Sequence, residues 1–241
     1  MDKIFSPPLA VFFVWNPSDT ELVKPIVNAV RKNFGRDKNR PFSRGLNIPL
    51  FFFSSQNCNE TPDNHPNQIA ERNIVFIFTS VNTVGRENWS DYIENFPISH
   101  ALNIIPVAID KNGLTHSGIL RGLNCIRSYE WVGENKDYHA IVSLAHEIYR
   151  FGFSSINSND EGKKSSINIF LSHAKADDTG RLHAEEIKRI IDNTNMNRFF
   201  DTTEISPGFP FDRKIEKHIP NSTLLAIESD AYSSRYWCQR E

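Results

Sequence analysis

Cysteine is scarce in this sequence and is not spaced for metal binding or disulfide formation. Cys58, Cys125 and Cys238 lie far apart, and no two of them form a Cys-x-x-Cys pair. An odd number of widely separated cysteines argues against a disulfide framework and against a zinc site. The cysteine content therefore predicts a protein of a reducing compartment, and we expect a cytoplasmic location.

An excess of charge of either sign and long hydrophobic runs are also missing. The chain has 27 Lys and Arg residues against 29 Asp and Glu residues. Proteins that bind nucleic-acid phosphates usually carry a positive excess, so the composition offers no support for nucleic-acid binding. The apolar run at residues 9–15 is far shorter than the roughly 20 residues that cross a membrane. Because prolines precede it and a polar stretch follows, we interpret it as a buried strand rather than a signal peptide.

Several common enzyme motifs do not occur. The sequence has no Gly-x-Gly-x-x-Gly after a predicted strand and no Gly-x-x-x-x-Gly-Lys-Ser/Thr. The dinucleotide-binding fingerprint and the phosphate-binding loop are therefore both excluded. The Gly-x-Ser-x-Gly of serine hydrolases and the His-Glu-x-x-His of metalloproteases are absent as well.

What the sequence does contain is an alternation of short apolar runs and amphipathic stretches. Apolar runs predict strands at residues 9–15, 48–53, 74–79 and 104–109. Helical spacing predicts helices at residues 89–96, at residues 138–151, and after Asp19, which we expect to be an N-cap. Short apolar strands that alternate with helices are typical of a parallel sheet covered on both faces.

A polar stretch of small residues at 154–166 is typical of a linker, and the same order of elements returns after it. Strands are predicted at residues 167–171, 198–200 and 223–227, a polar loop at 172–178, and helices through Leu182 and Ile191, at 214–218 and at 233–241. The sequence therefore predicts two tandem flavodoxin-like α/β units, residues 1–153 and 167–241. The second has no counterpart of residues 104–151, so we expect it to be truncated at its C-terminus.

Four segments of the second unit follow one another in a characteristic order. They are residues 167–174 with Asp177-Asp178, residues 199–208, residues 215–219, and residues 232–241, which contain Ser-x-x-Trp-Cys-x-x-Glu. Together these segments resemble the TIR (Toll/interleukin-1 receptor) domain, particularly that of bacterial defence proteins. The first unit looks like a divergent TIR-like domain.

Many TIR domains of this kind hydrolyse NAD+ at the nicotinamide–ribose bond, and the resemblance puts Glu241 at the catalytic glutamate. Nicotinamide is a good cationic leaving group, so the reaction needs no general acid. A carboxylate beside the ribose can stabilise an oxocarbenium-like transition state. Trp237 precedes Glu241 by four residues, so both lie on one face of a predicted helix. The alternatives are a core tryptophan and a solvated surface glutamate.

The resemblance also implies a substrate pocket at the carboxyl edge of the sheet, where open α/β folds bind ligands. The implied substrate-binding residues are Ser172, His173, Phe200, Asp201, Glu204, Gly208 and Trp237. Ordinary turn chemistry is the alternative for the loop residues. Asp178 is expected to cap the following helix rather than to contact NAD+. We expect no metal, and NAD+ as substrate rather than cofactor.

The first unit differs at the catalytic position. Aligning Trp89 with Trp237 puts Ile93 at the position of Glu241 and Glu94 one residue further along. One residue turns a helical side chain by about 100°. We therefore expect the first unit to be non-catalytic, with Glu94 a second candidate if the alignment is shifted.

The favoured function is a TIR-type NAD+ glycohydrolase that acts as an effector of bacterial anti-phage defence. It would release nicotinamide and ADP-ribose or a cyclic variant. The resemblance implies self-association through TIR domains and a phage-derived or small-molecule trigger, without nucleic acid or membrane. The alternative is a non-catalytic TIR scaffold for self-association and signalling.

Overall fold

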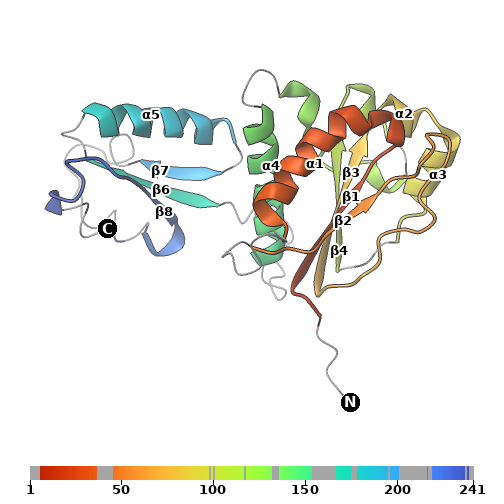
Figure 1. Ribbon diagram of the computed structural model, residues 1–241, viewed down its shortest axis with the longest axis horizontal. Helices are drawn as coiled ribbons and strands as arrows, with labels where there is room; N and C mark the ends of the chain where they lie inside the picture. The colour runs from red at the N-terminus through yellow and green to blue at the C-terminus, as the bar shows by residue number, and fades with distance from the viewer. Residues whose placement is uncertain are drawn as a thin grey trace, which may run out of the picture. The chain divides into compact units, whose positions relative to one another are not determined.

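The computed structural model describes residues 6–36, 46–97, 99, 101–116, 118–131, 136–153, 167–174, 178–194, 196–200, 216, 219–236 and 238. The chain divides into two compact units, Met1–Phe153 and Ser154–Glu241, which are both seen in Figure 1. Each unit is an α/β structure with its own parallel sheet. The prediction of an α/β fold with two parallel-sheet units is confirmed.

The sheet of the first unit has the strand order β2-β1-β3-β4-β5, and every pair is parallel. The strands are β1 (Leu9–Val14), β2 (Leu50–Phe53), β3 (Arg72–Thr79), β4 (Leu102–Ala108) and β5 (Ile126–Arg127). The strand order reverses between β1 and β3. In open α/β sheets this reversal places a crevice outside the carboxyl ends of those two strands.

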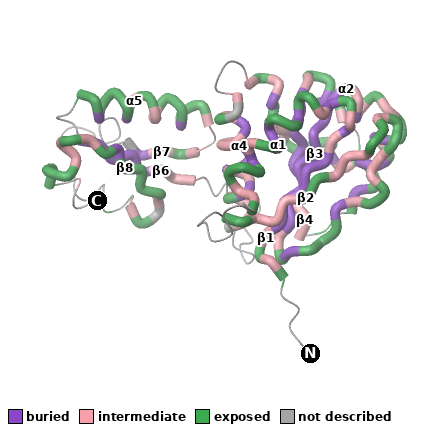
Figure 2. Tube along the Cα trace, viewed as in Figure 1, coloured by how far each residue is buried: buried purple, intermediate pink, exposed green. Residues whose placement is uncertain are grey.

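The helices of the first unit are α1 (Thr20–Phe34), α2 (Val81–Val84), α3 (Glu87–Glu94) and α4 (Lys136–Phe153). Short 3-10 turns are η1 (Pro17–Asp19), η2 (Asn112–Leu114), η3 (Gly118–Leu120) and η4 (Ser128–Glu130). Buried side chains of α1 and α4 pack with Phe13 and Phe76 on one face of the sheet. On the other face α3 and η3 pack with Phe12 and Val75. Both central strands are therefore buried along most of their length (Figure 2).

The second unit has a three-stranded parallel sheet in the order β7-β6-β8. Its elements are β6 (Asn168–His173), α5 (Asp178–Asp192), β7 (Asn197–Phe200), η5 (Ile219–Asn221) and β8 (Thr223–Ile227). The order repeats β2-β1-β3 of the first unit. Ala184 of α5 packs with Leu171 and Ile227, and Phe170 stacks on Phe199 at a centroid distance of 5.2 Å.

One sequence expectation in the second unit is wrong. Ser172 and His173 were expected to open a polar loop, but both belong to β6. The strand continues because its pairing with β8 extends to His173 opposite Ile227, and both side chains are buried. Of the helix expected at residues 214–218, only Glu216 is described, and it is helical. The helix expected at 233–241 does not begin at Ser233, because residues 233–235 are not helical; Tyr236 and Cys238 are helical. Over the part of the chain that is described, no helix has the length and apolar character needed to cross a bilayer.

Candidate functional site

In the second unit, two contacts join the end of β6 to the segment that follows β8. The hydroxyl oxygens of Ser172 and Tyr232 are 2.8 Å apart. The thiol of Cys238 donates to the carbonyl oxygen of His173, with a sulfur–oxygen distance of 3.8 Å. Ser172 and His173 are 3% and 5% exposed. Tyr232 and Cys238 therefore lie against the carboxyl end of the central strand.

The predicted pocket residues are described only in part. Ser172 and His173 lie together at this edge, and Phe200 ends the neighbouring strand β7, opposite Leu171 in register. The side chain of Phe200 is outside the described part of the structure. The other predicted residues, which lie entirely outside the described residues, are Asp201, Glu204, Gly208, Trp237 and Glu241.

The sequence did not predict two residues of this edge, Tyr232 and Cys238, and it assigned a different contact to Asp178 of α5. Tyr232 and Cys238 lie in the segment that carried the TIR resemblance, yet neither was predicted to contact β6. The sequence signal that could have identified them is the resemblance of residues 232–241 to a TIR domain, since both residues lie in that segment. Asp178 was expected to cap a helix beginning after it, but α5 begins at Asp178. Its carboxylate instead accepts a hydrogen bond from Arg181 at 3.2 Å, because one helical turn brings the two side chains together.

The corresponding edge of the first unit contains a buried carboxylate, Asp19. One oxygen accepts a hydrogen bond from the Ser80 hydroxyl at 2.6 Å, and the other accepts one from the Asn82 amide at 2.7 Å. Burial raises the pKa of Asp19 above its usual value, although both hydrogen bonds oppose that shift. Asp19 stands at the N-cap position of α1 but makes no capping hydrogen bond. The predicted N-cap position is therefore confirmed, but the capping hydrogen bond is not made, because these two partners, far away in sequence, take both carboxylate oxygens.

Further polar side chains close the same edge from the neighbouring loops. Asp110 accepts hydrogen bonds from the backbone amides of Val81 at 2.9 Å and Gly113 at 2.8 Å. The Asn16 amide reaches the backbone carbonyls of Cys58 and Asn82, both at 3.3 Å. These groups bond to one another and to the backbone. The network therefore fixes the loops around the β1/β3 crevice rather than presenting open ligand-binding groups.

Cys58 lies in the loop between β2 and β3, and its surroundings favour the thiolate. Arg86 donates to the Cys58 carbonyl at 3.0 Å and to the Asn59 side chain at 2.7 Å. Hydrogen bonds from Arg86 and Ser18 lower the pKa of the Cys58 thiol. Burial has the opposite effect on Cys125 and raises the pKa of its thiol.

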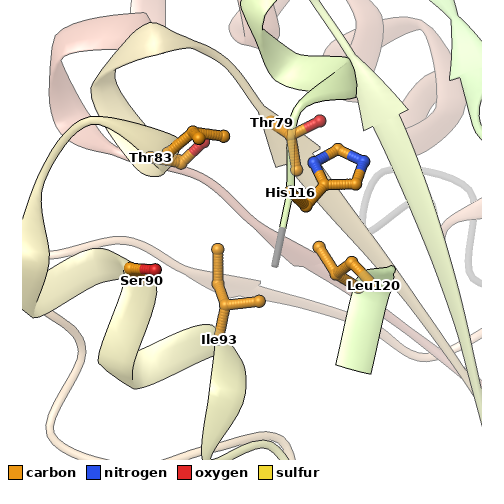
Figure 3. Close-up of a pocket in the computed structure, with 7 residues that line it drawn as sticks. Thr79, Thr83, Ser90, Ile93, His116 and Leu120 are labelled. Carbon is orange, nitrogen blue, oxygen red and sulfur yellow. The ribbon is translucent and has the colours of Figure 1, made fainter. Parts of the chain in front are cut away.

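A small cavity lies beside the carboxyl end of β3 (Figure 3). It has a volume of about 10 Å³ and is lined by Thr79, Thr83, Val84, Ser90, Ile93, His116 and Leu120. That volume holds about one water molecule. Nδ1 of His116 is buried and has no hydrogen-bond partner among the described residues. Burial also lowers the pKa of His116, which favours the neutral ring.

Ile93, the residue aligned with Glu241, contributes an apolar wall to this cavity (Figure 3). The neighbouring Glu94 lies against Gly118 instead. A Cβ added to Gly118 would be 2.4 Å from Glu94 Cγ, and the φ of Gly118 is +60°. A water-sized space with an isoleucine at the aligned position does not accommodate a nucleotide.

The described residues contain no group of three or more His, Cys, Asp or Glu side chains placed to hold a metal ion. Comparisons with protein-family models, with curated proteins and with solved structures gave no match for this chain.

Proposed function

We propose that the second unit is a TIR-type NAD+ glycohydrolase, that Glu241 is its catalytic carboxylate, and that the protein acts in the cytoplasm. The observation that carries the proposal is the contact between the Tyr232–Cys238 segment and the end of β6. This contact brings a segment ending three residues before Glu241 to the edge where Ser172 and His173 lie. In parallel α/β sheets this edge is where ligands bind.

For this reaction the protein must bind NAD+ and place one negative charge beside the ribose ring. Cleavage of the nicotinamide–ribose bond leaves positive charge on the ribose ring, and nicotinamide departs as a neutral molecule. A carboxylate beside the ring stabilises that charge in the transition state. The Tyr232 hydroxyl, which is held by the buried Ser172 and belongs to a partly exposed residue, offers a polar group at the same edge for the sugar or the phosphates. Water or a ribose hydroxyl then completes the reaction, giving linear or cyclic ADP-ribose.

In this proposal the first unit is a non-catalytic partner of the enzyme. Two observations support that division: Ile93 lines the cavity at the aligned position, and the cavity has room for about one water molecule. The enzyme would act as an effector in anti-phage defence. Self-association through the second unit and a phage-derived or small-molecule trigger would control it.

The test is nicotinamide release from NAD+, measured by chromatography. The variants are the wild-type chain, Glu241→Gln and Glu186→Gln. Glutamine keeps the shape of glutamate and removes its charge, and Glu186 is an exposed residue of α5 that serves as the matched control. We expect Glu241→Gln to reduce release by at least about 100-fold, the scale on which lost transition-state electrostatics is measured. Glu186→Gln should match the wild type.

Two other outcomes would contradict this proposal. Equal release by wild type and Glu241→Gln would refute the assignment and direct the search to Glu94, for which Glu94→Gln is the next variant. No release from the wild-type protein at high concentration, or after forced self-association, would favour the non-catalytic scaffold. The product spectrum separates linear from cyclic ADP-ribose.

A further inference from the structure

The β2 edge of the first unit's sheet, residues Leu50–Phe53, is apolar and open. Within the described residues β2 pairs only with β1. The strand has the sequence Leu-Phe-Phe-Phe and carries no charge. Phe51 and Phe52 are 37% and 42% exposed. Natural edge strands usually carry a lysine, a proline or a bulge that blocks pairing with another chain, and these four residues show none of those features.

The backbone of β2 presents donors and acceptors at this open edge. The carbonyl of Pro49 accepts a hydrogen bond from the Val11 amide at 3.0 Å, and that of Phe53 accepts one from the Trp15 amide at 3.2 Å. Backbone groups alternate between the two sides of a strand. Leu50 and Phe52 therefore point their amide and carbonyl groups away from β1. An added strand can bond to these groups without breaking a bond of the existing sheet.

The exposed rings of this edge are held in place on both faces of the sheet. Phe51 stacks on Phe12 with a centroid distance of 5.1 Å, and Phe52 stacks on Phe13 with a centroid distance of 5.8 Å. A partner strand would thus find an ordered edge, which reduces the entropy lost on association.

The two ends of β2 carry opposite charge. At its amino end, the exposed Arg31, Lys32 and Arg36 lie in and just after the last turn of α1. A hydrogen bond of 2.9 Å from the Ile48 amide to the Phe34 carbonyl joins that turn to the start of β2.

At the carboxyl end of β2, a hollow of about 430 Å³ includes Phe52, Phe53, Glu60 and Asp63 in its lining. Both carboxylate residues are exposed. The Ser55 hydroxyl donates to the Glu60 carbonyl at 2.6 Å, which keeps Glu60 beside the end of the strand.

We propose that the β2 edge is the contact surface for a second copy of this chain, paired antiparallel about a two-fold axis. A two-fold axis reverses the second strand, so the basic end of each copy meets the acidic hollow of the other. Parallel pairing would instead place like charges side by side. The contact is isologous and closes at the dimer. Because the strand is short, the dimer is weak and forms in a concentration-dependent way. This contact lies in the first unit and is independent of the second unit's activity.

The test is sedimentation equilibrium of the whole chain, with Phe52→Lys as the disrupting variant. Lysine on an edge strand opposes pairing. Leu123→Lys is the matched control, since Leu123 is a similarly exposed apolar residue in the segment that leads into β5, the opposite edge strand. We expect a reversible dimer for the wild type and for Leu123→Lys. Phe52→Lys should weaken association by at least about tenfold, and salt should weaken the wild-type dimer. Circular dichroism confirms that each variant is folded.

A charge swap tests the antiparallel direction without touching the strand. Arg36→Glu and Glu60→Lys should each weaken the dimer, and the two changes in one chain should restore it, because the two-fold axis pairs the exchanged ends again. Hydrogen exchange at the Leu50 and Phe52 amides should slow as the dimer forms. A chain that stays monomeric at millimolar concentration would overturn the proposal. So would an association of the chain, in the absence of any trigger, that Phe52→Lys leaves unchanged.

Discussion

At the scale of single residues, Asp19 illustrates how a buried carboxylate can hold a fold together. Its oxygens accept hydrogen bonds from Ser80 and Asn82, which lie 61 and 63 residues further along the chain. These bonds join the start of α1 to the start of α2. Asp19 is 4% exposed, so removing its carboxylate would leave the buried Ser80 hydroxyl and the half-buried Asn82 amide without this acceptor.

Asp19→Ala should therefore lower the free energy of unfolding by about 1–3 kcal/mol, the cost of leaving buried donors unsatisfied. Asp91→Ala, which truncates an exposed aspartate of α3, should change it by no more than about 0.5 kcal/mol. Urea unfolding of both variants measures the difference. If the two variants had the same free energy of unfolding, the Asp19 contacts would contribute nothing to stability.

The raised pKa of Asp19 also predicts the sign of a pH effect. The folded protein holds the Asp19 proton more tightly than the unfolded chain, whose pKa is near 3.8. The stabilising contribution of this proton is complete below pH 3.8 and is lost as pH rises through the raised folded value. Asp19→Asn should remove that part of the pH dependence. If the free energy of unfolding of Asp19→Asn changed with pH above 3.8 as steeply as that of the wild type, the prediction would be wrong.

Single residues also mark the limit of sequence reasoning about the sites. Asp19 follows a strand and precedes a helix, so local rules predict a cap. The competing partners Ser80 and Asn82 cannot be identified from local sequence. The same holds for Tyr232, whose contact with Ser172 depends on the register of β6 and β8.

At the scale of elements, the end of β3 depends on a glycine that allows close approach. The Thr79 hydroxyl donates to the Gly113 carbonyl at 2.9 Å. A Cβ on Gly113 would be 2.3 Å from the Thr79 carbonyl oxygen, which also accepts the Ile109 amide at 3.0 Å. The junction of β3, β4 and η2 thus has no room for a side chain at this position.

Gly113→Ala should displace the Thr79 carbonyl and speed hydrogen exchange at the Ile109 amide. Gly122→Ala is the matched control. Its φ of +87° is strained for alanine, but an added Cβ has nothing within 4 Å. Both variants should lose stability, by about 1–2 kcal/mol for Gly122. In Gly122→Ala, the hydrogen exchange rate of the Ile109 amide should increase only as much as the loss of overall stability explains. In Gly113→Ala it should increase by more than that. The same exchange rate in both variants would count against a close packing role.

The sequence predicted the helices and strands more completely than it predicted the contacts of single residues. β8 has the predicted bounds, and the predicted strands of the first unit agree with the observed ones to within about two residues. Continuous apolar runs suffice for this because a strand in a parallel sheet is buried on both faces. The end of β6 was the exception, since the polar Ser172 and His173 continue the strand through pairing with β8.

At the scale of the whole molecule, the two units differ in the size of their cores. Among the described residues of the first unit, two buried clusters contain fifteen and eleven residues, one on each face of the sheet. Within the described residues the second unit has clusters of three and two. Burial of apolar area is the main source of stability, so the second unit should be the weaker of the two.

Calorimetry of the chain should therefore show two transitions, with the second unit melting first. The fragment Met1–Phe153 should keep only the higher transition, because its two core clusters are internal to it. A single transition in the whole chain, absent from the fragment, would show that the two units stabilise each other.

The sequence by itself determined the class of the fold and its division. Short apolar runs and helical periodicity are local properties, and they are sufficient to specify buried parallel strands and their covering helices. The tertiary structure alone decided that Asp19 bonds to Ser80 and Asn82, that Ile93 lines a water-sized cavity, and that, among the described residues, β2 has no second neighbour and has opposite charges at its two ends. These features depend on strand order and register, which bring together residues that are distant in the sequence.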